Sequence, residues 1–473
     1  IELMPVMEFE GNESWGYNTA FHMSVDKFYG PEEKLKEFID LCHQNDIAVI
    51  FDLVMNHVMG RSPMNRMWMN DPDGNGWGEP SEESPYFNEI ATHSYGLGND
   101  FNHQSSYTQY YTQRVVKHWV EEFKIDGIRW DLTKGFTQNC NAGDDGCTNA
   151  YQQDRVDVLK SYADYSWSLD PDHYVIFEHL GGSSEEQQWA NYRLSEGKGI
   201  MLWGKTNTPY YQLAMGYGSD SNFSGIGHES RGFNGKRLVG YFESHDEERV
   251  MYKALQFGND WDGYNIQELN TALSRMSAIG AMSLTIPGPK MIWQFGELGF
   301  ENSINTCEDG TVSESCKLSK KKSAFELGMQ NDSRRIKLFN VWSRILKLRN
   351  SESIFKTNNF ITTFSSDLKY MILNDDSSEN IKKVIVIANF GTQTKEVNGI
   401  ILPNGEWYNI YGNNSKITIS DQNKLSLSPG QFIILADKQT SIEDDEALLL
   451  SSEKTGINTR YCRHASFRRR TRL

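Results

Sequence analysis

The chain has 473 residues, a formal net charge of −16 at pH 7 and a sequence pI near 5.2. This acidic balance disfavours nucleic-acid binding, and no apolar run in the sequence is long enough to suggest membrane insertion. We therefore expect a neutral substrate, with neither nucleic acid nor membrane as a partner, in a protein longer than one ordinary domain.

Short apolar runs alternate with helical periodicity over the first 350 residues. Apolar residues recur at helical spacing over 35–42, behind Pro31, and a strand from about Ile47 to Val54 follows. The same alternation continues with helical segments at 116–123, 156–163 and 273–286, followed in turn by strands that end at 131, span 174–177 and span 290–295. Continuous apolar runs are typical of parallel strands buried on both faces. The pattern predicts a (β/α)8 TIM barrel, with a catalytic domain over 1–350.

Two further regions depart from this alternation. Residues 59–108 are polar and rich in Gly, Pro, Asn and Trp. This segment is too long for a plain connection between two elements, so we predict an insertion at the barrel rim. Residues 351–437 contain short alternating stretches separated by turn residues, which predicts an antiparallel C-terminal β-sandwich domain.

Both ends of the chain are unusual. Ile1 to Val6 is a strand-like run without an initiator Met, so we expect the chain to enter a barrel already begun, with its first strand missing. Residues 438–473 become acidic and then arginine-rich. We favour a disordered tail there over an arm for an anionic partner.

Six cysteines are present, and four of them bracket two short polar loops. Cys140 pairs by position with Cys147, and Cys307 with Cys316. Because neither pair has zinc-site spacing, we expect two disulfides in an oxidising compartment, the alternative being four loop thiols in a cytosolic protein. Cys42 and Cys462 are expected to stay outside these pairs.

Aromatic residues are frequent in segments that we expect to form loops, where flat rings suit the faces of sugars, the alternative that we favour for any single ring being packing. These residues are Trp68, Trp77, Tyr86, Tyr95, Trp203, Tyr210 and Tyr211.

Carboxylates stand at or near the ends of several predicted strands. Since the C-terminal ends of parallel barrel strands meet at one rim, Asp131, Glu178 and Asp246 should converge and could act together on one bond. Asp52 lies within its strand, so we interpret it as a buried carboxylate that supports Arg129 or a neighbouring strand.

Four motifs give the sequence a specific resemblance: FDLVMNH at 51–57, GIRWDLTK at 127–134, FEH at 177–179 and FESHD at 242–246. They resemble, in order, the signature regions of the α-amylase superfamily (glycoside hydrolase family 13). Lesser matches lie at 16–17, 100–102 and 288–297, so the resemblance covers residues 1 to about 437. The sequence of residues 243–249 is most similar to that of secreted amylase-like proteins of Bacteroidetes-type bacteria.

The resemblance implies a role for each matching residue. Asp131 resembles the nucleophile, Glu178 the general acid and base, and Asp246 the third carboxylate that binds ring hydroxyls. A nucleophile and an acid about 5 to 5.5 Å apart imply retention of anomeric configuration. The residues that the resemblance places in substrate binding are Tyr17, His57, Arg129, Lys134, His179 and His245.

A calcium site is also implied, because Asn56 and Asp100 occupy the family's ligand positions and the backbone carbonyl of Gly135 is a possible third ligand. The alternative is that Asn56 only bonds backbone beside His57. Two positions depart from the pattern. Gly135 stands where many amylases have His, and Ser244 replaces a common Asn.

We expect a retaining glycosidase that cleaves α-1,4 bonds in starch- or glycogen-like α-glucans. A transglycosylase of the branching-enzyme type shares the same carboxylates and is the nearest alternative. A non-catalytic glucan-binding protein would be expected to have lost at least one of the three. We further expect a monomer that is extracellular, at the cell surface or periplasmic.

Overall fold

The structure, a computed structural model, describes residues 1–442 and divides them into two compact units. The first comprises Ile1–Trp203 with Arg231–Arg237, and the second comprises Gly204–Ser230 with the described residues from Leu238 onward. The domain boundary predicted near residue 350 thus lies inside the second unit. Residues 443–473 of the predicted tail lie outside the described residues.

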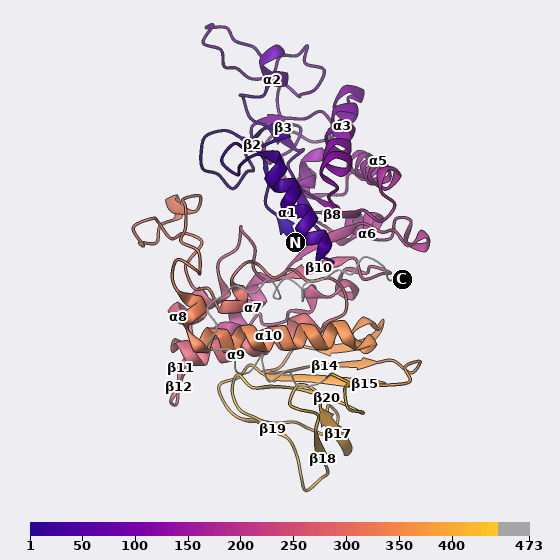
Figure 1. Ribbon diagram of the computed structural model, residues 1–473, viewed down its shortest axis with the longest axis vertical. Coiled ribbons are helices and arrows are strands. Elements are labelled where there is room, and N and C mark those ends of the chain that lie inside the picture. The colour runs from indigo at the N-terminus through magenta and orange to yellow at the C-terminus, as the bar shows by residue number, and fades with distance from the viewer. Residues whose placement is uncertain (443–473) are drawn as a thin grey trace. The chain divides into compact units, whose positions relative to one another are not determined.

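A parallel sheet organises the first unit (Figure 1). Its strands pair in the order β1, β4, β7, β8 and β9, and every pair is parallel. The helices α1, α3 and α5 connect successive strands, which is the crossover that parallel pairing requires. The elements of this unit are β1 (Glu2–Leu3), β2 (Met7–Phe9), β3 (Thr19–Val25), α1 (Glu32–Gln44), β4 (Ile50–Leu53), β5 (His57–Val58), α2 (Pro63–Met67), β6 (Asn99–Asp100), α3 (Ser106–Phe123), β7 (Gly127–Trp130), η1 (Thr133–Phe136), α4 (Asp145–Asn149), α5 (Gln153–Leu169), β8 (Tyr174–Phe177), α6 (Ser183–Ala190), η2 (Leu194–Glu196) and β9 (Met201–Lys205).

The predicted strand from Ile1 to Val6 is shorter than expected, because only β1 pairs with β4. Pro5 interrupts the run, since proline offers no backbone N–H to a ladder. The insertion at 59–108 leaves the sheet after β5, carries α2 and returns at β6, which pairs with β5. Figure 1 shows the loops around α2 extending away from the strands of this unit.

The second unit contains helices α7 to α10 and an antiparallel sheet. Its elements are α7 (Asn207–Met215), η3 (Ser224–Ile226), β10 (Leu238–Tyr241), α8 (Val250–Phe257), β11 (Asp260–Trp261), β12 (Tyr264–Asn265), α9 (Leu269–Thr285), η5 (Gly296–Leu298), η6 (Glu314–Cys316), η7 (Met329–Asn331), α10 (Ser333–Ser351), η8 (Ser353–Lys356), β13 (Asn359–Thr363), β14 (Leu368–Asn374), β15 (Lys383–Asn389), β16 (Lys395–Glu396), β17 (Gly405–Asn409), β18 (Ser415–Ile419), β19 (Ser426–Leu427) and β20 (Phe432–Ala436). A further short turn of helix, η4 (His228–Arg231), ends where the chain passes back to the first unit.

The strand predicted over 290–295 is wrong in extent. Only Lys290 forms a parallel bridge, with Gly240 of β10, and Met291 N donates to Gly240 O at 3.1 Å. Pro287 and Pro289 remove two donors immediately before this bridge, and residues 296–298 already form η5.

The C-terminal strands form a sheet in the order β13, β14, β15, β20, β17 and β18. Successive residues of β15 face opposite sides, as a strand requires. Val384 and Val386 pack with α9 and α10, whereas Ile385 and Ile387 belong to a second core on the other face. Figure 1 shows α9 and α10 running alongside β14 and β15.

Both predicted disulfides are confirmed. Cys140–Cys147 and Cys307–Cys316 have Cα–Cα distances of 5.7 and 5.0 Å, within the range that a disulfide spans. Cys42 is buried on α1, and Cys462 lies outside the described residues.

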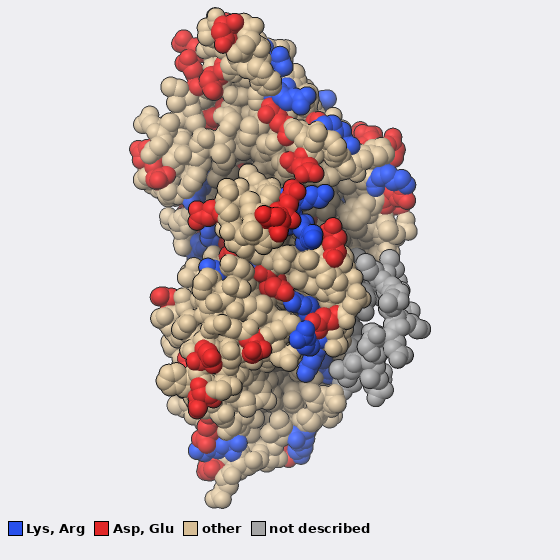
Figure 2. Space-filling model, turned by 90° about the vertical axis from the view of Figure 1, so that its left-hand side faces the viewer, with Lys and Arg blue, Asp and Glu red and all other residues tan. Residues whose placement is uncertain are grey.

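Acidic and basic side chains are interspersed on the surface in Figure 2. Within residues 1–442, every helix is too short or too polar to cross a bilayer.

Candidate active site

Two predicted catalytic carboxylates follow neighbouring strands of the first unit. Asp131 comes directly after β7 and Glu178 directly after β8, and the last residues of these strands, Trp130 and Phe177, are register partners. Asp131 N donates to Leu53 O at 3.1 Å, and Glu178 N donates to Trp130 O at 3.0 Å. Because the backbone pairing continues past the strand ends, it places both side chains at the same edge of the sheet.

The Arg129 guanidinium, which is fully buried, joins these carboxylates. Its Nη1 lies 2.8 Å from Asp131 Oδ1, and its Nη2 lies 3.4 Å from Glu178 Oε2. Nη1 also donates to both oxygens of Asp52, at 2.7 and 2.9 Å, which confirms the interpretation of Asp52 as a support for Arg129. Three carboxylates thus surround one cation.

The charge of this cluster controls the proton affinity of Asp131. Burial raises the pKa of its carboxyl well above the ordinary value, and the charges of Glu178 and Asp52 raise it further against the opposing effect of Arg129. One guanidinium does not neutralise three carboxylates, so the cluster favours retention of a proton. A pair of carboxyls that holds one proton can supply both an acid and a nucleophile.

Glu178 is fixed by the residues that follow Asp131. Its Oε2 accepts a hydrogen bond of 2.8 Å from Leu132 N, and its backbone carbonyl accepts bonds from Thr133 N and Oγ1. Leu132 has a φ of 42°, in the left-handed region, and this turn points its N–H at the carboxylate. The side chains of Asp131 and Glu178 are 11% and 15% exposed, so a small opening reaches both.

Aromatic and imidazole side chains complete this side of the cluster. The Tyr17 hydroxyl donates to Asp52 Oδ2 at 2.6 Å, and His57 Nε2 lies 2.9 Å from Tyr17 O. The Trp203 ring centroid lies 4.0 Å from Arg129 Cζ. Tyr17 therefore contacts Asp52 of the carboxylate cluster and His57 contacts the backbone of Tyr17, while their substrate-binding roles stay predictions.

The predicted loop positions of three aromatic residues are wrong. Trp203 lies on β9, and Tyr210 and Tyr211 lie on α7. Sequence reasoning therefore missed the stacking of Trp203 on Arg129. Its neighbours Met201, Leu202 and Gly204 are buried as well, and this apolar run was the signal for a strand.

Lys134 follows Asp131 in the sequence and His179 follows Glu178. Both side chains contact residues outside the carboxylate cluster. Lys134 Nζ donates to Asn149 Oδ1 at 2.7 Å and lies 5.4 Å from the Tyr95 ring centroid. His179 is almost fully buried, with Nε2 3.0 Å from Glu185 Oε2 and Nδ1 3.3 Å from Thr133 Oγ1. Burial lowers the pKa of His179 to about 4. This geometry suits His179 as a support for the loop at Thr133 rather than as a substrate contact.

His245 and Asp246 belong to the second unit. His245 Nε2 lies 3.4 Å from Asp246 Oδ2, and Lys317 Nζ donates to Asp246 Oδ1 at 3.0 Å. The Asp246 side chain is 48% exposed, as a group that receives a ligand would be. Lys317 had no signal in the sequence motifs.

Glu243, the second residue of the FESHD motif, is a buried carboxyl that stabilises the loop carrying His245 and Asp246. Its Oε1 accepts a 2.6 Å hydrogen bond from Val250 N at the start of α8. Burial raises the pKa of Glu243 from 4.5 to about 7, opposed by Arg249 and assisted by the charges of Glu297 and Glu248.

We expect Glu243→Gln to stabilise the protein at alkaline pH. A carboxyl whose pKa is raised on folding loses stabilising free energy as pH rises from 4.5 through about 7, whereas Gln carries no such penalty. The free energy of unfolding of the variant should match the wild type near pH 4.5 and exceed it by up to about 3 kcal/mol at pH 8. Urea denaturation at both pH values measures this difference, with Glu13→Gln, an exposed position, as control. An equal difference at both pH values would contradict it.

The predicted calcium ligands cluster beside the insertion. Asn56 Oδ1 is buried and accepts no hydrogen bond from the described residues, and a side chain at Gly135 would collide with it. Asp100 accepts bonds from Asn88 and Thr92 at Oδ2 and lies 2.9 Å from His93 Nε2 through Oδ1. The unsatisfied oxygen of Asn56 fits a hard cation that takes oxygen ligands.

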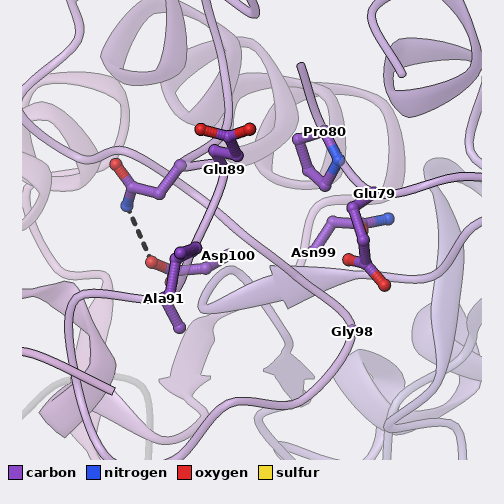
Figure 3. A pocket seen from close by; sticks show the side chains of 9 residues that line it. Glu79, Pro80, Glu89, Ala91, Gly98, Asn99 and Asp100 are labelled. Carbon is purple, nitrogen blue, oxygen red and sulfur yellow. Dashed lines mark hydrogen bonds between the residues drawn. The ribbon is translucent and has the colours of Figure 1, made fainter. Parts of the chain in front are cut away.

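A cavity of about 290 Å³ opens on the insertion side of Asp100. Figure 3 shows the carboxylates of Glu79, Glu89 and Asp100 at its wall, with the hydrogen bond from Asn88 to Asp100. Its lining includes neither Asp131 nor Glu178, so it is distinct from the carboxylate cluster.

Known proteins resemble this chain in sequence and in fold. A family model described as the α-amylase catalytic domain matches residues 1–62. A malto-oligosyltrehalose trehalohydrolase of Saccharolobus solfataricus is 25% identical over 319 residues, which cover 64% of this chain and 51% of that protein. A 1,4-α-glucan branching enzyme of Halothermothrix orenii is 30% identical over 207 residues, 40% of this chain and 31% of that enzyme. The chain thus spans about half or less of these relatives.

Solved structures match almost the whole chain. A pullulanase type I from Bacillus subtilis complexed with maltose matches with a TM-score of 0.66 and 19% identity, over 92% of this chain and 62% of that one. An α-amylase from Geobacillus thermoleovorans complexed with acarbose matches with a TM-score of 0.63 and 16% identity, over 92% and 87%. These matches confirm the predicted fold class, a (β/α)8 barrel with a C-terminal β domain.

The comparisons also support the predicted resemblance to the α-amylase catalytic domain of glycoside hydrolase family 13. They do not reach the Bacteroidetes-type subgroup, since the relatives come from an archaeon and from other bacteria. That finer assignment stays a prediction.

Proposed function

We propose that this protein is a retaining glycosidase that cleaves α-1,4 bonds in starch- or glycogen-like α-glucans. The observation that carries the proposal is the shared contact of Asp131 and Glu178 with the Arg129 guanidinium, at 2.8 and 3.4 Å. Contact of both carboxyls with one guanidinium supports the short separation, about 5 to 5.5 Å, that direct attack by one of them requires.

The proposed reaction has two steps. In the first, Asp131 attacks the anomeric carbon, and Glu178 donates a proton to the leaving glycosidic oxygen as the bond to that oxygen breaks. In the second, Glu178 removes a proton from water, which displaces Asp131 from the sugar. Two inversions give net retention. The Arg129 guanidinium opposes the rise in the Asp131 pKa that burial causes, and the N–H of Leu132 orients Glu178.

Asp246, His245 and Tyr17 enter the proposal as substrate-binding groups. We assign ring-hydroxyl binding to Asp246 with His245, and stacking beneath the reacting sugar to Tyr17. Among the solved structures of this fold, a pullulanase is complexed with maltose and another with maltotetraose, which supports an α-glucan as the substrate class.

A branching transglycosylase is the second candidate, because several relatives of similar identity are named 1,4-α-glucan branching enzymes. It would pass through the same covalent intermediate, which a sugar hydroxyl rather than water would intercept. Incubation with soluble starch and chromatography of the products distinguishes the two. Short linear oligosaccharides support the proposed hydrolase, new branch points support the transglycosylase, and no product contradicts both.

We further propose that the protein acts as a monomer in an oxidising compartment outside the cytoplasm. The two short loops closed by disulfides support this localisation. Fractionation of the source cells, with detection of the Cys307–Cys316 peptide in its oxidised form, tests it.

Calcium binding by Asn56 Oδ1, Asp100 and the carbonyl of Gly135 completes the proposal. The ion would supply positive charge beside His57 and would tie the insertion to the loop after Asp131. We expect saturating Ca²⁺ to raise the midpoint of thermal unfolding by a few degrees over EDTA-treated protein. Asn56→Ser should abolish the increase, whereas Asn70→Ser, at an exposed position, should retain it. Equal melting of wild type in Ca²⁺ and EDTA would remove calcium from the proposal.

A further inference from the structure

A lysine from a distant loop lies on the proposed third carboxylate. Lys317 Nζ donates to Asp246 Oδ1 at 3.0 Å, although the two residues are 71 positions apart. Asp246 Oδ2 lies 3.4 Å from His245 Nε2, so the carboxylate is contacted at both oxygens. The Lys317 and Asp246 side chains are 41% and 48% exposed, which leaves room for a sugar beside them.

The backbone of Lys317 is held by a covalent link and by local hydrogen bonds. The Cys307–Cys316 disulfide ends one residue before it, at the close of η6. On the other side, Lys321 Nζ donates to the carbonyls of Cys316, Lys317 and Ser319 at 3.0, 2.8 and 2.8 Å. These constraints hold the backbone of Lys317 in place and therefore limit where its side chain can reach.

The same loop is attached to the FESHD motif region at a second point. Glu248 accepts hydrogen bonds from Ser303 Oγ at 2.6 Å and from Ile304 N at 2.9 Å. Arg249 Nη1 in turn donates to Ser244 O at 2.7 Å. The segment 303–321 and the loop that carries Asp246 are therefore joined by hydrogen bonds at more than one point.

We propose that Lys317 is a positioning residue for Asp246 in glucan binding, and that the Cys307–Cys316 disulfide sets its place. The inference deepens the proposed function and rests on it. An ammonium bonded to Asp246 Oδ1 fixes the rotamer of the carboxylate, so that the carboxylate accepts hydrogen bonds from ring hydroxyls without first being ordered by substrate. Without the lysine, the hydrogen bond to Asp246 Oδ1 would be lost.

Steady-state kinetics on a maltooligosaccharide test the proposal. Lys317→Met keeps most of the length of the side chain and removes its charge, and we expect kcat/KM to fall about two- to fivefold, mainly through KM, because exposed ion pairs are weak. Lys317→Glu should lower it by more, since it places a second carboxylate beside Asp246. Lys320→Met, at an exposed position of the same loop, should behave as wild type.

The disulfide is tested by a double-mutant cycle. Replacing Cys307 and Cys316 by Ser should reproduce the loss seen in Lys317→Met and add little to it in the combined variant, because both changes remove one interaction. Additive losses would show that the disulfide acts independently and would overturn its assigned role. A Lys317→Met enzyme with the KM of wild type would overturn the proposal as a whole.

A contact test that needs no activity separates this inference from the proposed function. A carbodiimide joins a carboxylate to an amine only when the two are in contact, so it should link Asp246 to Lys317 in wild type and much less in the Cys→Ser double variant, as measured by peptide mass spectrometry. Absence of the cross-link in wild type overturns the inference whatever the enzyme cleaves. If the wild type forms the cross-link but the untreated enzyme is inactive on α-glucans, the glucan-binding role is overturned together with the proposed function.

Discussion

Asp131→Asn should lower turnover on α-glucans by several orders of magnitude while the protein stays folded. Only the ionised carboxylate can form the covalent bond to the anomeric carbon, and an amide at this position is a poor nucleophile. The amide oxygen can still accept the hydrogen bond of Arg129, which also remains paired with Asp52. Initial rates on soluble starch, measured over hours to detect slow turnover, give the size of the loss.

The melting temperature distinguishes a lost nucleophile from a lost fold. Burial of Asp131 already disfavours its charged form, so the neutral amide should melt at or above the temperature of wild type. Asp40→Asn, on the exposed face of α1, serves as the matched control and should leave both activity and melting unchanged. More than a few per cent of wild-type activity in Asp131→Asn would exclude it as the nucleophile.

The core of this site could be predicted because it depends on local rules. Strand periodicity places Arg129 and Asp131 on one face of β7, two residues apart, and the parallel register then brings Glu178 alongside. Apolar runs of four residues were sufficient to locate β7 and β8. The support from Asp52 followed from its place inside β4, where a buried carboxylate needs a cation.

What could not be predicted depends on long-range packing or on proline. The contact of Lys317 with Asp246 is set by a disulfide loop whose direction no periodicity encodes. Trp203 was predicted on a loop, although the two residues before it, Met201 and Leu202, pair with β8. The strand expected over 290–295 is limited to one bridge, because prolines precede it.

Asp246 is less firmly defined than the other two carboxylates. The motif order alone identifies it, because one of its partners, His245, is simply its neighbour in sequence and the other, Lys317, comes from a loop 71 residues away. Asp131 and Glu178, by contrast, are defined by backbone pairing as well as by motif. The mutational tests of these two therefore carry the greatest weight for the mechanism.

Glu178→Gln should abolish cleavage of natural α-glucans nearly as completely as Asp131→Asn, for a different reason. A glutamine cannot give a proton to the leaving oxygen, and a sugar alkoxide is a poor leaving group without one. The bond from Leu132 N can still form with the amide oxygen, so the geometry of the turn should persist. Initial rates on starch measure this loss of cleavage.

A substrate whose leaving group needs no proton distinguishes the role of Glu178 as the acid from the role of Asp131 as the nucleophile. On an α-maltosyl substrate with fluoride as the leaving group, departure needs no proton, and Asp131 can still attack. The Glu178→Gln variant should therefore form the covalent intermediate at a rate near that of wild type, and the intermediate should accumulate because no base activates water in the second step. Mass spectrometry of the quenched protein should show the added maltosyl mass, on the peptide that contains Asp131. Equal loss on starch and on the fluoride, with no labelled peptide, would contradict the assignment of Glu178 as the acid and base.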